Sequence, residues 1–250
     1  MIQLTIIKIT GYGPWTLTLG SDREHKLQML QSSLYNEIQN LFSEKDGLVF
    51  SNRFDELFAI TNGLSLNDHV KIQKQLAKSF DVKISMTIGY GDTPFEANLK
   101  ADQGRKSKII LEKKYNIFGY MDGKASQLVQ IMHMDVDGST SISEKKSPYE
   151  ISSLMFKLYS EMSEFFLTKN FLTFFMGGDN FMIVASGDGK QHAMKFLNLM
   201  KKKHDIALNC GVGTARTARE AAKLATKSLD TIRDIRDSGK SNQRILEITC

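Results

Sequence analysis

The stretch Phe171-Leu-Thr-Phe-Phe-Met-Gly-Gly-Asp-Asn-Phe-Met-Ile-Val-Ala-Ser186 contains two apolar runs on either side of a single carboxylate. Both runs are rich in aromatic and β-branched residues, which favours buried strands over short helices. Gly177 and Gly178 supply the turn, because residues without a Cβ let the backbone bend tightly. The stretch therefore predicts a β-hairpin that holds Asp179 at its tip.

A carboxylate at a hairpin tip has two common roles. It caps its own backbone in the turn, or it binds a metal ion together with a second carboxylate. The segment Leu128-Val-Gln-Ile-Met-His-Met-Asp-Val-Asp-Gly-Ser-Thr140 offers that second carboxylate, since an apolar strand is predicted to end there in Asp135-Val-Asp137. Asp135 and Asp137 point to the same side of an extended chain.

Small residues follow these carboxylates directly, namely Gly138, Ser139 and Thr140. Their backbone N–H groups suit phosphate oxygens. Oxygen ligands without soft partners favour Mg²⁺, with Mn²⁺ as the alternative, and Mg²⁺ is usually held by one or two carboxylates plus substrate phosphates. The leading hypothesis is a metal–nucleotide site.

The composition indicates an ordinary globular protein. The chain has 250 residues, 41% of them hydrophobic, and a formal charge of +5. This modest charge fits a small polyanionic nucleotide, and without an aromatic-interleaved basic stripe we expect no nucleic-acid partner. Two cysteines indicate a reducing compartment and cannot build a cysteine-rich zinc site. We expect a cytoplasmic protein without a membrane segment, because the apolar N-terminus is too short and alternating to be one.

The sequence repeats itself at a nearly fixed offset of 124 residues. Three anchors share this offset, which makes chance agreement improbable and indicates a tandem duplication. The boundary is expected between about Gly104 and Ser126, giving domains 1–120 and 121–250. The anchors are Asp55 with Asp179, Gly63 with Gly187, and Thr93-x-x-Glu96 with Thr217-x-x-Glu220.

Each repeat is predicted to run strand, helix, strand, strand, helix, strand, helix, which is the split β-α-β arrangement of ferredoxin-like sheets. The fold class is therefore α+β, with two tandem ferredoxin-like domains, each an antiparallel sheet with helices packed on it. In this topology the first strand and the hairpin are neighbours, so Asp135 and Asp179 should converge. Helix starts are expected at the capping residues Ser21, Ser65, Thr93, Ser147 and Thr217.

The first repeat departs from the second at the predicted site. The alignment places Thr10 opposite Asp135 and Phe54 opposite Gly178, which leaves Asp55 as the remaining carboxylate. We therefore expect the N-terminal sheet to be a poor metal site, serving packing or recognition of the rest of the ligand.

The second half resembles the palm-type domain of class III nucleotidyl cyclases and diguanylate cyclases, in which a strand-end Asp and a Gly-Gly-Asp hairpin hold two metals. Nearly the whole chain resembles the archaeal GTP cyclohydrolase III family, whose members are expected to have Asp where this chain has Thr10. The segments that carry this resemblance are Gly11-Tyr-Gly-Pro-Trp-Thr16, Arg53-Phe-Asp55, Ile60-Thr-Asn-Gly63, Gly177-Gly-Asp-Asn-Phe-Met182 and Arg216-Thr-Ala218.

The resemblance implies Mg²⁺-dependent hydrolysis of GTP to a formylamino-pyrimidine nucleotide monophosphate and two phosphates, with the imidazole ring opened at C8 and the formyl group retained. It implies that Asp135 and Asp179 hold the metals, with the Val136 carbonyl and Asp137 as further candidates and a monovalent cation as an assisting ion. The phosphates would lie against Gly138 to Thr140 and Gly178, and Arg216 would clamp the triphosphate bidentately.

Several residues keep more than one interpretation. Asp137 is a ligand, an orienting residue or a turn residue, and Arg216 is a phosphate clamp or an exposed loop arginine. His133 is expected to alternate away from Asp135; it is more often a packed residue than an acid–base catalyst. The aromatic residues Tyr12, Trp15 and Phe54 either stack on guanine or belong to the core.

Two other functions stay open. A nucleotidyl cyclase would share the metal site but usually builds it across a homodimer. A non-catalytic nucleotide sensor is disfavoured because the second repeat keeps both carboxylates. We also expect a homo-oligomer, either a dimer or a tetramer, since symmetric assembly is common.

Overall fold

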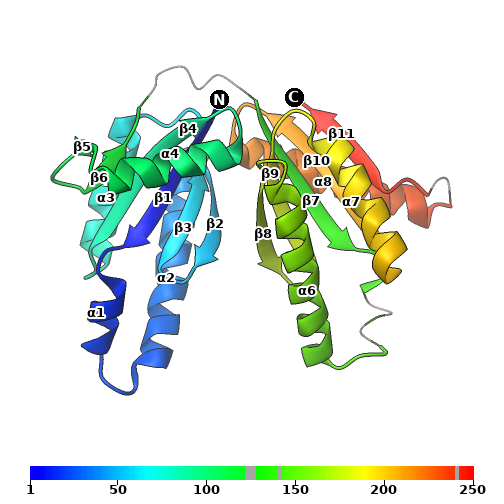
Figure 1. Cartoon of the computed structure of the whole chain (residues 1–250), viewed down its shortest axis with the longest axis horizontal. Coiled ribbons are helices and arrows are strands. Elements are labelled where there is room, and N and C mark those ends of the chain that lie inside the picture. Colours follow the sequence, from blue (N-terminus) through cyan, green and yellow to red (C-terminus); the bar gives the residue numbers. More distant parts are fainter. Residues whose placement is uncertain (122–127, 140–141, 143, 240–241) are drawn as a thin grey trace. The chain divides into compact units, whose positions relative to one another are not determined.

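The computed structural model describes residues 1–121, 128–139, 142, 144–239 and 242–250 (Figure 1). The chain divides into two compact units, one of Met1–Asp92 with Glu96–Gln127 and one of Leu128–Cys250 with Thr93–Phe95. Each unit is a sheet with helices on both faces, so the predicted α+β class is confirmed. Within the described residues, no helix is long and apolar enough to cross a membrane.

The first unit has a six-stranded sheet in the order β2-β3-β1-β4-β6-β5. Strands β2, β3, β1 and β4 are antiparallel neighbours in the ferredoxin-like order, and β6 runs parallel to β4. The elements are β1 (Ile2–Ile9), α1 (Tyr12–Leu17), α2 (Arg23–Ser43), β2 (Leu48–Arg53), β3 (Glu56–Ile60), α3 (Leu66–Ser79), β4 (Ile84–Gly91), α4 (Pro94–Lys106), β5 (Ile110–Glu112) and β6 (Ile117–Gly119).

The second unit repeats this plan in a five-stranded sheet of order β11-β10-β7-β9-β8. Strand β11 runs parallel to β10, as β6 does to β4, so the duplicated segment includes this added strand. The elements are β7 (Val129–Val136), α6 (Pro148–Leu167), β8 (Leu172–Gly177), β9 (Asn180–Ala185), α7 (Gly189–His204), β10 (Leu208–Ala215), α8 (Ala218–Asp237) and β11 (Ile245–Thr249).

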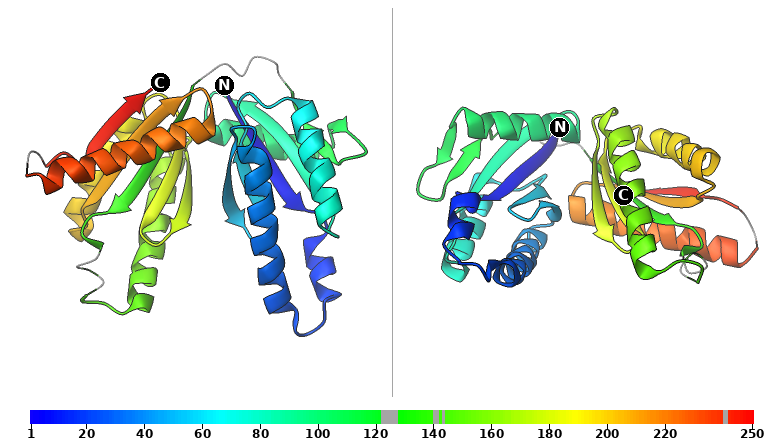
Figure 2. Two further views of the ribbon diagram at one scale, coloured as in Figure 1. Left: turned by 180° about the vertical axis from the view of Figure 1, so that it is seen from behind. Right: turned by 60° about the horizontal axis from the view of Figure 1, so that its bottom comes forward.

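Helices cover the two faces of each sheet unequally. In the first unit α2 and α3 lie on one face and α4 on the other; in the second, α6 and α7 lie on one face and α8 on the other (Figures 1 and 2). Alternate residues of β7, including Met132 and Met134, are buried in the core beneath α6 and α7. The intervening residues, including His133 and Asp135, therefore face α8.

Glycines allow α4 and α8 to pack closely on their sheets. A Cβ on Gly89 of β4 would lie 2.2 Å from the Ala97 carbonyl oxygen, and one on Gly213 of β10 would lie 2.1 Å from that of Ala221. The two pairs are 124 residues apart, so the same close contact occurs in both repeats. In the second unit, α8 therefore packs closely on the sheet face that carries Asp135.

Of the five capping predictions, three hold and one fails; at the fifth, Thr93, α4 begins directly afterwards at Pro94, as predicted. Ser65 and Ser147 form capping boxes at α3 and α6, and the Thr217 side chain accepts from the Glu220 N–H at α8. The capping box predicted at Ser21 is wrong, because α2 begins after Asp22 and that residue makes no side-chain cap. Helix α1 and the short strands β5, β6 and β11 were not predicted.

The strand register corrects the alignment of the two repeats. Lys8 pairs with Glu56 and Ser85 in the first sheet, as Asp135 pairs with Asn180 and Asn209 in the second. The structural equivalent of Asp135 is therefore Lys8 and not Thr10. The predicted offset fails here because β1 and β7 are 127 residues apart, whereas the hairpins are 124 apart.

Candidate active site

Asp135 and Asp179 lie at the same edge of the second sheet. Asp135 is the penultimate residue of β7 and pairs with Asn180, the first residue of β9. Asp179 precedes Asn180 in the turn after Gly177 and Gly178, whose φ angles are 101° and 61°. Such positive φ angles favour glycine, so the Gly-Gly sequence fixes a turn that holds Asp179 next to the end of β7.

Asp135 is a buried carboxylate with one oxygen left without a partner. The residue is 4% exposed, and its Oδ2 accepts a hydrogen bond of 2.5 Å from Nη2 of Arg233 on α8. Among the described residues its buried Oδ1 has no hydrogen-bond partner. A buried carboxylate oxygen is costly when unpaired, so Oδ1 is suited to a cation.

Arg233 links the two carboxylates electrostatically. The hydrogen bond that Arg233 donates to Asp135 raises the pKa of Arg233, and burial acts in the opposite direction. The negative charges of Asp135, Asp230 and Asp179 raise the pKa further. The guanidinium is therefore within the electrostatic range of both Asp135 and Asp179. It balances negative charge at this edge of the sheet.

Asp137 has both carboxylate oxygens occupied by arginines. Its Oδ1 accepts from Nη1 of Arg236, and its Oδ2 accepts from Nη1 of Arg244. Burial alone raises the pKa of Asp137, but the hydrogen bond and charge of Arg244 and the charge of Arg236 outweigh burial and lower it. The Asn209 Oδ1 accepts from the same two arginines at 3.3 and 3.2 Å. Asp137 thus orients two guanidinium groups beside Asp135.

His133 lies on the same face as Asp135, so the prediction that it points away is wrong. Residues two apart in a strand share a face. Its Nε2 donates to the Asn180 Oδ1 at 3.0 Å, its Nδ1 lies 3.1 Å from the Thr226 hydroxyl, and Asn180 Nδ2 donates to Asp179. Burial lowers the pKa of His133 despite the hydrogen bond to Asn180. Neutral His133 therefore positions Asn180, which holds Asp179.

The predicted phosphate-binding residues follow the end of β7. Val136 is the last residue of β7, and Gly138 has a φ of 67° in the turn that follows. Gly138 and Ser139 therefore lie near the two carboxylates in sequence and space, whereas Thr140 lies outside the described residues. At Gly178, a Cβ would meet only Asn180 Nδ2, at 3.8 Å, so the turn has open space in front of it.

Arg216 does not reach this edge. It follows Ala215, the residue of β10 that pairs with Val129 at the opposite end of β7. Asp135 pairs with Asn209, six residues earlier in β10, and six strand residues span about 20 Å. Within one chain, the expectation that Arg216 clamps a triphosphate held at Asp135 is therefore wrong. The resemblance to the family pointed to Arg216 in the sequence, but it did not indicate at which end of the second sheet Arg216 lies.

The three predicted base-stacking aromatics all belong to the first unit. Tyr12 and Phe54 line one pocket of about 530 Å³, and Trp15 lines another of about 490 Å³. Phe54 is 75% exposed, and the Tyr12 and Trp15 rings are 6.1 Å apart and tilted. Phe54 is therefore not a core residue, whereas Tyr12 packs against the hydrophobic core of the first unit, so the core alternative holds for Tyr12.

Sequence reasoning missed the arginines. Arg233, Arg236 and Arg244 contact Asp135 and Asp137 from positions about 100 residues later in the chain, the first of them 98 residues after Asp135. The available signal was the spacing of Arg233 and Arg236, which puts both on one side of α8. The ferredoxin-like order places that last helix on the sheet, so these residues could have been assigned to the site.

The architecture and the paired carboxylates define a duplicated α+β protein with an acidic, arginine-lined site on its second copy. The sequence profile of GTP cyclohydrolase III matches residues 1–247. The chain belongs to the GTP cyclohydrolase III family.

Two relatives named GTP cyclohydrolase III match nearly the whole chain. The chain is 35% identical to GTP cyclohydrolase III of Methanothermobacter thermautotrophicus, over 93% of this chain and 95% of that one. It is 37% identical to GTP cyclohydrolase III of Methanocaldococcus jannaschii, over 93% and 88%. Among solved structures, a bacterial light-regulated adenylyl cyclase is 12% identical, with a TM-score of 0.43 over 99% of this chain and 85% of that one.

Proposed function

We propose that this protein hydrolyses GTP at the edge of the second sheet, opening the imidazole ring of guanine at C8 and releasing two phosphates. Membership of the GTP cyclohydrolase III family supports the substrate and the reaction class. The observation that carries the location is the unpartnered Oδ1 of buried Asp135, next to Asp179. Residues 121–250 are the proposed catalytic domain, and residues 1–120 the accompanying one.

The donor set at this edge fits Mg²⁺ or Mn²⁺. Asp135 Oδ1 and Asp179 provide hard oxygen ligands, and the Val136 carbonyl at the end of β7 is a third candidate. No group of three or more His, Cys, Asp or Glu side chains suited to a metal is gathered within the described residues. A two-carboxylate site that substrate phosphates complete is the usual way to hold Mg²⁺. When bound, the ion supplies Lewis-acid activation of phosphate and water.

The arginines are the proposed phosphate ligands. Arg233 donates to Asp135 Oδ2, and Asp137 holds Arg236 and Arg244 beside it. Guanidinium groups pair bidentately with phosphate, and these three lie at the correct end of the sheet. Asp137 therefore acts as a positioning residue, because its oxygens already accept hydrogen bonds. Gly138 and Ser139 would add backbone contacts to the phosphates.

The first unit carries no equivalent carboxylate pair. Lys8 replaces Asp135, and its Nζ lies 3.7 Å from Asp55 and 3.2 Å from Glu56. The Lys8 ammonium group and the Arg53 guanidinium, which lies 3.2 Å from Asp55, already pair with these carboxylates. We therefore assign the first unit to packing or to recognition of the rest of the ligand. A homo-oligomer in the cytoplasm remains our expectation, and light scattering on the purified protein tests its oligomeric part.

The test is incubation with GTP and Mg²⁺, followed by mass spectrometry of the nucleotide and a phosphate assay. We expect a ring-opened monophosphate that retains the formyl carbon, with two phosphates released per GTP. Asp179→Asn should lower the rate at least about a hundredfold. Asp205→Asn, which removes an exposed carboxylate at the left-handed C-cap of α7, should leave it unchanged.

Other products would assign another function. A cyclic nucleotide or dinucleotide with pyrophosphate would make the protein a nucleotidyl cyclase. Tight GTP binding without turnover would make it a sensor. Equal turnover by wild type and Asp179→Asn would move the site away from this hairpin.

A further inference from the structure

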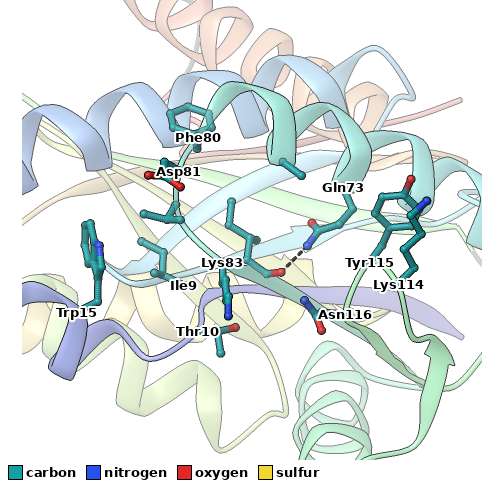
Figure 3. Close-up of a pocket in the computed structure, with 13 residues that line it drawn as sticks. Ile9, Thr10, Trp15, Gln73, Phe80, Asp81, Lys83, Lys114, Tyr115 and Asn116 are labelled. Carbon is teal, nitrogen blue, oxygen red and sulfur yellow. Dashed lines mark hydrogen bonds between the residues drawn. The ribbon is translucent and has the colours of Figure 1, made fainter.

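A second pocket in the first unit has the features of a ligand site. It has a volume of about 490 Å³ and lies where β1 ends and β4 begins, beside the C-terminal half of α3. Figure 3 shows Trp15 on one side of it, Tyr115 and Lys114 on the other, and Lys83, Thr10 and Asn116 between them. This volume is in the range of small-molecule sites.

Gln73 gives the pocket an unsatisfied buried acceptor. The residue is 4% exposed and lines the pocket, and its Nε2 donates to the Ile84 carbonyl, which fixes the amide (Figure 3). Its Oε1 is buried and has no hydrogen-bond partner in the described part of the chain. Because a buried oxygen without a hydrogen bond is unfavourable, the site favours a ligand with an N–H donor.

Charge and aromatic residues define the rest of the ligand. Lys83 is exposed at the pocket and makes no ion pair with any described residue, whereas Lys114 lies over the Tyr115 ring at 5.5 Å. Asp81 also lines the pocket and opposes a highly charged anion. Trp15 presents an aromatic surface on which a planar ring can stack. Two lysines beside one carboxylate give the pocket a small net positive charge, which suits a monophosphate better than a triphosphate.

The duplication supplies an internal comparison. A pocket of about 500 Å³ occurs at the equivalent place in the second unit, beside α7 and the start of β10. There Leu197 stands in the position of Gln73 and Ala207 in the position of Lys83, each 124 residues later. The buried amide and the lysine thus have no counterpart at these two positions, although Lys190, Lys201 and Arg244 line the second pocket at other positions. They are not needed for this fold, which argues for a ligand specific to the first unit.

We propose that the first-unit pocket binds a nucleoside monophosphate. The base would stack on Trp15 and donate an N–H to Gln73 Oε1, and the phosphate would contact Lys83. This site does not depend on the proposed GTP hydrolysis. It gives the first unit a ligand of its own, in addition to the packing or recognition role assigned to that unit above.

Trp15 makes the test direct, because it is the protein's one tryptophan. GMP is titrated into the full-length protein without Mg²⁺, and Trp15 fluorescence is followed. We expect a saturable change that weakens at least about tenfold in Gln73→Leu and in Lys83→Ala, each of which introduces the residue of the second pocket. Lys78→Ala, which removes an exposed lysine of α3 outside the pocket, and Asp179→Asn should match the wild type.

Two further probes separate the parts of the ligand. Guanosine should bind more weakly than GMP, because it lacks the group for Lys83, and inorganic phosphate should leave Trp15 fluorescence unchanged. The proposal is overturned if GMP has no effect, if phosphate alone reproduces the change, or if Lys83→Ala binds GMP as the wild type does. Because Lys83 is exposed, that variant tests the site even if Gln73→Leu fails to fold.

Discussion

Arg233 is the residue on which the charge balance of the candidate active site depends. It donates to the buried Asp135, and its own side chain is 41% exposed. We expect Arg233→Ala to lower the free energy of unfolding by about 1–3 kcal/mol, because it leaves the buried Asp135 without its partner while solvent screens the exposed side of the pair. Urea denaturation without divalent ions measures this difference.

Mg²⁺ should then restore more stability to Arg233→Ala than to the wild type, since a cation at Asp135 replaces the missing charge. Arg219→Ala, which changes an exposed arginine of α8 at the other end of the helix, is the matched control. An equal effect of Mg²⁺ on both variants would contradict a cation site at Asp135.

His69 should make the stability of the first unit depend on pH. It is fully buried, with its Nδ1 donating to the Ser65 carbonyl and its Nε2 2.8 Å from the Thr5 hydroxyl. Burial lowers its pKa, so the unfolded chain takes up a proton at a higher pH than the folded one. The free energy of unfolding should fall as the pH drops below about 6.5, the ordinary pKa of histidine.

His69→Gln keeps a donor and an acceptor but does not titrate. Urea denaturation at pH 7 and at about pH 5.5 should therefore give a smaller loss of stability for this variant than for the wild type. The same pH dependence in both proteins would assign the effect to other histidines.

Individual helices differ in how their first turns are capped. Ser65 and Ser147 make reciprocal capping boxes at α3 and α6, whereas Asp22 at α2 makes no side-chain cap. We expect Ser65→Ala and Ser147→Ala each to cost about 1 kcal/mol of stability. Asp22→Ala should cost less than about 0.5 kcal/mol, as for an ordinary surface position. Thermal or urea denaturation distinguishes these values, and a full cost at Asp22 would contradict the assigned cap.

The elements that local sequence specifies were predictable, and those that depend on distant pairing were not. The Gly177-Gly178 turn and the cap at Ser147 follow from residues that are neighbours in sequence. Strands β5, β6 and β11 are short or carry no clear alternation, and they form by pairing with β4, β10 or one another. The contact of Arg233 with Asp135 depends on how α8 lies on the sheet, which the order of the elements indicates but no local pattern encodes.

The two units together make a comparison within one molecule. Strand register aligns Lys8 with Asp135 and Glu56 with Asn180. We expect Mg²⁺ to slow hydrogen exchange at the β8–β9 hairpin of the second unit and to leave the β2–β3 hairpin of the first unchanged. Equal protection of both hairpins would contradict a single carboxylate site per chain.

Exchanging the charge at Lys8 should create a second cation site. Lys8→Asp places a further carboxylate beside Asp55 and Glu56, which are 16% and 14% exposed in their side chains. We expect calorimetry to find one additional Mn²⁺ bound per chain, because three clustered carboxylates bind a hard cation. Lys8→Met removes the ammonium without adding an oxygen and should bind no more Mn²⁺ than the wild type.

The two hairpins differ in the origin of their positive charge. In the first hairpin it belongs to the protein, as the side chain of Lys8. An ammonium group on a side chain cannot be removed by a chelator, so the first hairpin keeps its charge balance in any ionic medium. On the proposal made above, the second hairpin binds its cation from solution and can release it with the product. One half of the protein would therefore respond to the supply of divalent ions while the other half remains indifferent to it.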